Sequence, residues 1–175
     1  TSQISQICII VSPDTLSLQG YRDSYYAIAE HVVRLGDHLP NLKRVVFISS
    51  TGVYGQNAGE IIDINTPVFA PASATSQVIL QTEQLLQQHF EDKSVIIRPS
   101  GIYGASVARL EKMARSMSSY PNLHWSNRIH IEDLSRFMAE MIHVEHLESS
   151  YILTNNQPQL LHEVLQWFQQ QMRLP

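Results

Sequence analysis

The sequence is poor in the residues on which several classes of protein depend. It contains one cysteine among 175 residues, so it has no disulfide framework. Because that residue, Cys8, lies in an apolar run, we expect a buried structural thiol. The formal net charge is −4 and no cluster of lysine and arginine occurs, which argues against a nucleic-acid-binding surface.

Long hydrophobic runs are also missing. No apolar segment approaches the roughly 18 residues that a membrane-spanning helix needs, and the N-terminus lacks a signal-peptide pattern. The composition, 43% hydrophobic and 16% charged, is that of an ordinary globular protein. We therefore expect a soluble, cytoplasmic protein whose length allows one domain with a substantial core.

Short apolar stretches rich in β-branched residues are present. Residues 45–48, Val-Val-Phe-Ile, have the pattern of a strand buried on both faces of a parallel sheet, and 7–11 and 94–98 are similar. Apolar residues recur at three- and four-residue steps over 21–39 and 73–90, which predicts two helices. Strands that alternate with helices predict an α/β fold with parallel strands and right-handed crossovers.

The domain organisation follows from this alternation. We expect a partial Rossmann-like unit of three strands over residues 1–120 and a smaller mixed lobe over 121–175, packed together as one compact unit. Ser73 is the expected N-cap of the second helix, and Ser100 to Gly104 are expected to form a loop. In the smaller lobe, residues 122–130 are a candidate short strand, and a helix is expected from Ile131 to about His146.

Small hydroxyl residues follow the predicted strands directly. Ser49, Ser50 and Thr51 come immediately after the strand at 45–48. In open α/β sheets ligands bind at the carboxyl ends of the strands, so the sequence places polar groups where a binding site is expected.

Three motifs carry a family resemblance. SSTGVYG (49–55), RPSGIYG (98–104) and NRIHIEDL (127–134) occur in the order found in extended short-chain dehydrogenases/reductases. The chain resembles the atypical, NAD-dependent epimerase/dehydratase-like branch from about Ile7 to Met172. The resemblance implies a Rossmann sheet that holds NAD or NADP and a C-terminal lobe for a small substrate such as a nucleotide sugar. Family members often have Asn at the position matching Gly101, and its absence here disfavours a nucleotide sugar.

The resemblance also implies the site residues. Ser50, four residues before Tyr54, matches the hydroxyl that orients a substrate oxygen, although a serine that only satisfies a turn is the alternative. Thr75 and Ile79 occupy the positions of the catalytic Tyr and Lys. Neither can replace them, because an aliphatic hydroxyl ionises far above the value of about 10 for a phenol.

The remaining predicted site residues come from the other strand ends. For the cofactor side we predict Ser12, Ser49, Pro99 and Ser100. For the substrate side we predict Thr51 and Tyr103, and Ser50 and Thr75 remain the candidate catalytic positions. We predict no metal site, because His143 and His146 fit a solvated helix face better than a ligand pair.

The glycine-rich phosphate loop of the family has no counterpart here. Gly52, Gly55 and Gly59 follow a strand but lead into a proline-containing loop rather than a helix. The resemblance places the start of this chain at the family's fourth strand. Two explanations stay open, a piece of a longer protein and a naturally shortened paralogue, and either leaves an open edge strand and an uncovered sheet face.

Two functions are therefore expected. The first is an NAD(P)-dependent epimerase/dehydratase-like protein with a degenerate Tyr–Lys pair. The second is a non-catalytic module that senses a dinucleotide or binds a protein, with a homodimer through helices 21–39 and 73–90. We interpret His130 and Asp133 as a buried hydrogen-bonded pair rather than a general base, and Trp125 and Trp167 as residues that pack either in the core or in the smaller lobe.

Overall fold

A parallel sheet forms the centre of the computed structural model, which describes residues 3–56, 58–68, 71–104, 106–117 and 124–173. The sheet has four strands in the order β1 (Gln6–Ile9), β2 (Arg44–Ile48), β3 (Ser94–Pro99) and β7 (Ser150–Leu153). Val46 pairs with Cys8 on one side and with Val95 on the other. The predicted parallel α/β fold is confirmed, and one strand more than expected joins it, because residues 150–153 pair with β3.

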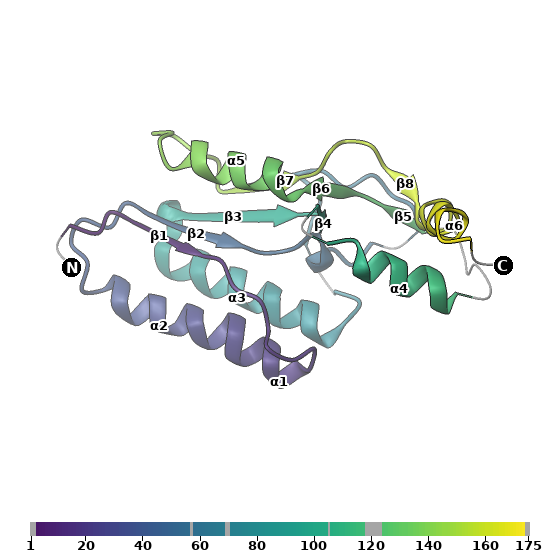
Figure 1. Cartoon of the computed structure of the whole chain (residues 1–175). Helices are drawn as coiled ribbons and strands as arrows, with labels where there is room; N and C mark the ends of the chain where they lie inside the picture. The colour runs from purple at the N-terminus through teal and green to yellow at the C-terminus, as the bar shows by residue number, and fades with distance from the viewer. Residues whose placement is uncertain (1–2, 57, 69–70, 105, 118–123, 174–175) are drawn as a thin grey trace.

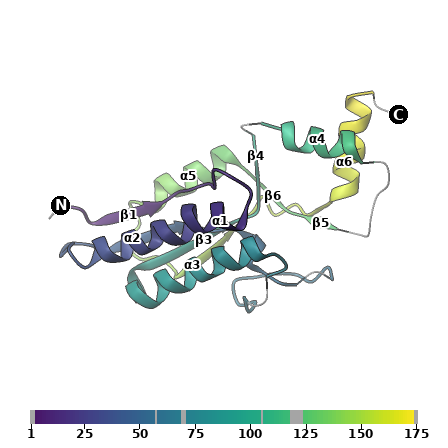
Figure 2. The same ribbon diagram turned by 90° about the horizontal axis from the view of Figure 1, so that it is seen from below.

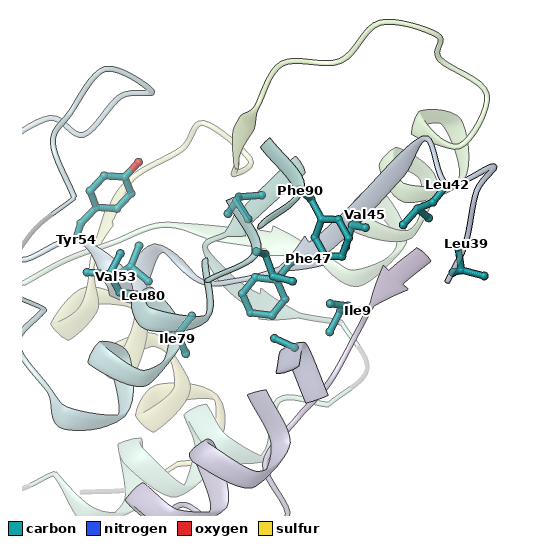
Figure 3. Packing of buried hydrophobic residues seen from close by; sticks show 13 residues of the cluster. Ile9, Leu39, Leu42, Val45, Phe47, Val53, Tyr54, Ile79, Leu80 and Phe90 are labelled. Atoms are coloured by element: carbon teal, nitrogen blue, oxygen red, sulfur yellow. The ribbon is translucent and has the colours of Figure 1, made fainter. Parts of the chain in front are cut away.

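Two helical segments cover one face of this sheet (Figure 1). The first runs through α1 (Leu18–Tyr21), a π-helical turn η1 (Arg22–Tyr26) and α2 (Ala27–Gly36), and the second is α3 (Ala74–Phe90). Ser73 caps α3 as predicted, since its side chain accepts a hydrogen bond from the Ser76 amide. Figure 3 shows the core between these helices and the sheet, which includes Ile9, Val45, Phe47, Val53, Ile79, Leu80 and Phe90.

Helix α5 (Ile131–Met141) covers the opposite face of the central strands. Its side chains Leu134 and Met141 form a second buried cluster with Val46, Val95 and Ile97. The expectation of an uncovered face is therefore wrong for β2 and β3.

The outer strand β1 is covered on one face only. Ile9 points into the helix-covered core and is 3% exposed, whereas Ile10, just beyond the strand, is 68% exposed. Successive residues of a strand face opposite sides, so Cys8 faces away from that core and is exposed. The prediction of a buried thiol is wrong because α5 does not shield the outer face of β1.

A smaller lobe lies beyond the carboxyl ends of β2 and β3 (Figures 1 and 2). It contains two short strand pairs, a parallel one between β4 (Gly101–Tyr103) and β6 (Arg128–His130) and an antiparallel one between β5 (Trp125–Ser126) and β8 (Gln159–Leu160). Helices α4 (Ala108–Ser116) and α6 (Leu161–Gln171) lie side by side in it.

Several predictions for this region are wrong in detail. Residues 101–103 form a strand rather than a loop, and the helix expected to reach His146 ends at Met141. Trp125 and Trp167 are 52% and 55% exposed, so neither is a core residue. The beginning of the strand predicted over 122–130 lies outside the described residues. Within the described ranges, no helix has both the length and the apolar character that crossing a membrane requires.

Candidate functional site

The turn after β2 places three hydroxyl residues at the carboxyl edge of the sheet. Ser49 is buried and its hydroxyl donates a hydrogen bond to the Glu83 carboxylate. Ser50 begins the 3-10 turn η2 (Thr51–Val53), where its Oγ accepts from the Gly52 amide at 3.0 Å. Ser50 therefore makes the hydrogen bond expected of a serine that satisfies a turn. Because its Oγ only accepts in this bond, the hydroxyl proton can still be donated to a second partner.

The ends of β2 and β3 are joined at this edge. The Thr51 hydroxyl donates to the Pro99 carbonyl at 3.5 Å, and the Ser49 amide donates to the Ile97 carbonyl at 2.7 Å. The predicted residues from these two strands are thus brought together, as the parallel topology requires.

A buried ion pair lies beneath the turn and was missed in the sequence. Arg98 Nη2 lies 2.7 Å from Glu83 Oε2 and Arg98 Nε lies 3.0 Å from Oε1, with the side chains 7% and 1% exposed. Arg98 Nη1 also donates to the Tyr54 hydroxyl at 2.9 Å. Burial works to lower the pKa of Arg98, but the hydrogen bonds and charge of Glu83 outweigh it and the pKa is raised. The pair fixes Ser49 and Tyr54 and forms a rigid base for the edge.

Among the described residues, no hydrogen bond joins Thr75 to Ser50, and the Thr75 hydroxyl lies 3.1 Å from that of Ser73 instead. The hydroxyl of α3 that lies near Ser50 is that of Ser76 rather than Thr75. Both Ser50 Oγ and Ser76 Oγ lie close to Gly52, at 3.2 Å and 3.3 Å from the position that a Cβ would take there. Ile79, at the position of the family's lysine, is 6% exposed and belongs to the core.

Thr75 lines a cavity of about 540 Å³ between α1, the start of α3 and α4. Tyr21, Arg109 and Lys112 line the same cavity. None of these three was a candidate in the sequence, because they come from separate elements and share no motif. The cavity therefore holds a phenol and two cations beside the degenerate tyrosine position.

The other predicted cofactor-side residues occupy the neighbouring strand ends. Ser12 is exposed in the segment that follows β1. Ser100 follows β3 and is buried, and its Oγ has no hydrogen-bond partner in the described part of the chain. Its amide donates to the Leu153 carbonyl at 2.9 Å, which holds the residue against β7.

Tyr103 lines a second cavity, of about 310 Å³, between β4, β6 and α4. Arg109 borders this cavity as well, and Arg128 extends into it from β6. Burial, and then the nearby charge of Arg109, lower the pKa of Arg128, while Tyr103 opposes them. Both arginines are functional candidates that the sequence did not reveal.

The expected pair of His130 and Asp133 does not form. His130 Nδ1 accepts from the Glu132 amide at 3.3 Å and begins α5, and its ring lies edge-on to Tyr103. Asp133 points to Arg136 at 3.5 Å on the exposed side of the helix. His143 and His146 are exposed, as predicted, but they lie beyond the end of α5 rather than on a helix face. In the ranges that the structure describes, no three His, Cys, Asp or Glu side chains are placed to hold a metal ion.

Comparison with known proteins gives matches in structure. No family profile and no curated protein matches the sequence. The structure of a protein from Methylobacillus flagellatus described as an NAD-dependent epimerase/dehydratase is 33% identical in sequence. The match has a TM-score of 0.74 and covers 90% of this chain and 57% of that one. A UDP-glucuronic acid 4-epimerase from Bacillus cereus in complex with NAD is 14% identical, with a TM-score of 0.76 over 99% of this chain and 61% of that one. A dTDP-glucose 4,6-dehydratase from Bacillus anthracis in complex with NAD is 16% identical, with a TM-score of 0.78 over 98% and 58%.

The parallel sheet, its helical layers and the hydroxyl turns at its carboxyl edge define a Rossmann-like α/β protein. More narrowly, the chain is a structural match to the NAD-dependent epimerase/dehydratase family, the extended short-chain dehydrogenases/reductases, as its three motifs indicated. It spans 57% to 61% of the length of the three solved structures named above.

Proposed function

We propose that this chain forms the substrate-side part of an NAD(P)-dependent epimerase/dehydratase-like protein in which the Tyr–Lys pair is degenerate. The observation that carries the proposal is the meeting of strand-end hydroxyls and cavities at one edge. Thr51 bonds to Pro99 across two strand ends. Thr75, the neighbour of Ser76, whose hydroxyl lies close to Gly52 in the turn after β2, lines a cavity of about 540 Å³. Ligands of open α/β sheets bind at this edge.

The described residues fit one part of a dinucleotide. Ser100 offers a buried hydroxyl without a partner among them, which suits a hydrogen bond to a cofactor amide. Pro99 ends β3 directly before Ser100, and Ser12 lies in the exposed segment that follows β1. The described ranges contain no glycine-rich turn between a strand and a helix, so they offer no cradle for the pyrophosphate. A dinucleotide bound here would supply the hydride chemistry. The residues of this chain would orient the substrate beside it.

Three hydroxyl residues at the edge and in the cavity can act on a substrate oxygen. Thr75 can hold a substrate oxygen by a hydrogen bond, but its hydroxyl is too weak an acid to release a proton near neutral pH. Tyr21 is a phenol in the same cavity and is the better proton donor. Ser50 keeps a free hydroxyl proton for a substrate oxygen because its bond to Gly52 uses only a lone pair.

A second candidate function is a non-catalytic module that senses a dinucleotide or binds a protein. It is favoured by Ile79, which is an apolar core residue where the family has its lysine. Helix α2 also exposes Ile28 and Leu35, at 37% and 43%, which supports a homodimer through the two long helices.

Titration of the chain with NADH and NADPH, followed by cofactor fluorescence, tests both functions. Ser100→Ala should weaken binding about tenfold, since it removes the unpartnered hydroxyl at the edge. Ser94→Ala is the matched control, because Ser94 Oγ is also buried without a partner in the described residues but lies at the opposite end of β3. Binding with turnover supports the enzyme, and binding without turnover supports the sensor. No binding at millimolar cofactor contradicts the enzyme and the dinucleotide sensor.

A further inference from the structure

The larger cavity, of about 540 Å³, has an aromatic wall that is fixed to the core. Tyr21, the last residue of α1, lines it, and the Tyr21 ring stacks on that of Tyr25 with centroids 5.4 Å and planes 18° apart. Tyr25 in turn packs edge-on against the buried ring of Phe47 on β2, at 6.1 Å. Stacking on Tyr25 covers only one face of the Tyr21 ring, and the side chain is half-buried. Tyr21 is therefore a held aromatic ring that borders an open space.

The backbone changes its hydrogen-bond pattern directly after this ring. The Tyr21 amide donates to the Ser17 carbonyl at 3.0 Å, four residues back, whereas the Ala27 amide donates to the Arg22 carbonyl, five residues back. A single π-helical turn inside an α-helix is rare and is frequent at functional sites. The π-turn η1 is thus an observation independent of the cavity that singles out the same position.

The other walls of the larger cavity also suit an aromatic ring. Leu16 and Met113 line it with apolar groups, and Leu16 is 89% exposed, so a ring beside it would cover apolar surface. Arg109 and Lys112 line it from α4, and both kinds of cation bind the faces of aromatic rings. A cavity of about 150 Å³ already holds benzene, so this one has room for a ring with substituents.

We infer that this cavity, which we call the Tyr21 cavity, binds the planar aromatic ring of a small substrate, stacked against Tyr21. Thr75 and Ser116 add hydroxyl groups that can bond to polar substituents of the ring. The inference rests on the proposed function in treating the cavity as the substrate side, and it names the substrate class as aromatic. This class differs from the sugar nucleotides after which the two compared enzymes from Bacillus are named.

Titration of the isotope-labelled chain with benzoate and with cyclohexanecarboxylate, followed by amide chemical shifts at constant pH and ionic strength, tests the inference. The two probes have the same charge and a similar size, but only benzoate has an aromatic face. Contact between aromatic rings contributes affinity beyond the burial of their surface, so we expect benzoate to bind about three- to tenfold more tightly. The shifts should lie at the residues that line the Tyr21 cavity.

Variants of Tyr21 show whether its ring causes the preference. Tyr21→Leu should remove the preference for benzoate, and Tyr21→Phe, which keeps the ring, should retain it. Tyr26→Leu is the matched control, because Tyr26 lies on the same π-turn but borders neither cavity, and it should behave as the wild type.

The outcomes separate this inference from the proposed function. Equal affinity of the wild type for the two probes, no saturable binding of benzoate at millimolar concentration, or an unchanged preference in Tyr21→Leu overturns the inference. The comparison of the two probes on the wild type decides the matter even if Tyr21→Leu does not fold. NADH titration of the same samples reports the proposed function separately. A preference for benzoate without NADH binding supports the aromatic site alone, and NADH binding without the preference overturns the aromatic site alone.

Discussion

Replacing Glu83 by glutamine should destabilise the protein strongly. The change keeps the size of the side chain but removes the charge that compensates Arg98, whose side chain is 7% exposed. Removing one partner of a buried ion pair costs roughly 3–5 kcal/mol, because the other charge stays buried and uncompensated. A glutamine oxygen still accepts one hydrogen bond, so we expect about 3 kcal/mol.

Urea denaturation followed by circular dichroism measures this free energy directly. For a chain of this size, a loss of about 3 kcal/mol also corresponds to a fall of roughly 6–12 °C in the melting temperature. The matched control is Asp133→Asn, which breaks the exposed pair of Asp133 and Arg136, whose closest atoms are 3.5 Å apart. Exposed pairs contribute about 0–1 kcal/mol, so this variant should remain close to the wild type.

The double replacement Glu83→Leu with Arg98→Met adds a second test. Replacing a buried ion pair by apolar side chains of similar volume is often neutral, so the double variant should be more stable than Glu83→Gln. The reasoning is refuted if Glu83→Gln loses no more stability than Asp133→Asn. Such a result would mean that the Arg98 charge is compensated without Glu83.

Three further predictions concern local structure and reactivity. Gly104→Ala should cost about 1–3 kcal/mol in urea denaturation, because Gly104 has φ of 109° and a Cβ there would lie 2.3 Å from His130 Nε2; an unchanged midpoint contradicts this. Ser73→Ala should cost about 1 kcal/mol by loss of the α3 cap, and Ser73→Asn should retain most of it. Although Cys8 is exposed as a residue, partial burial of its thiol raises the pKa of Cys8 more than the Arg44 charge lowers it, so its thiolate forms at higher pH. Cys8 should thus react with iodoacetamide more slowly at mildly alkaline pH than a cysteine in a short peptide, and an equal or faster rate contradicts the shift.

The sequence predicted the main elements because their signals are local. The apolar β-branched runs at 45–48 and 94–98 and the periodicity of 73–90 depend only on neighbouring residues, and all three appear as predicted. The motifs at the strand ends also placed the edge correctly. The strand β4 was missed because its three residues pair with Arg128 to His130, far along the chain, and carry almost no strand signal of their own.

The buried ion pair had a signal that the sequence analysis did not use. Glu83 lies on the same helical stripe as Ile79, Leu86 and Phe90, all of which are buried. A charged residue in such a stripe requires a buried partner, and Arg98 ends the adjacent apolar strand. This pairing was therefore within reach of sequence reasoning.

Arg109 and Arg128, which border the smaller cavity, had no comparable signal. The two arginines lie on different elements, α4 and β6, separated in the chain by β5 and a connecting segment. Arg109 occupies an exposed helical position and Arg128 a short strand, and both are ordinary surroundings for arginine. Only the pairing of β4 with β6 opposite α4 brings them to one cavity, so three-dimensional structure was needed to find it.

The claim on which the proposed function depends is that ligand binds at the carboxyl edge of the sheet. Amide chemical shifts of the isotope-labelled chain, recorded during titration with NADH, test it most directly. We predict shifts concentrated at residues 12, 50–52, 75–76 and 100–103. Shifts centred on Lys43 and Lys93, which precede β2 and β3 at the opposite edge, or no shifts at millimolar NADH, would contradict the claim.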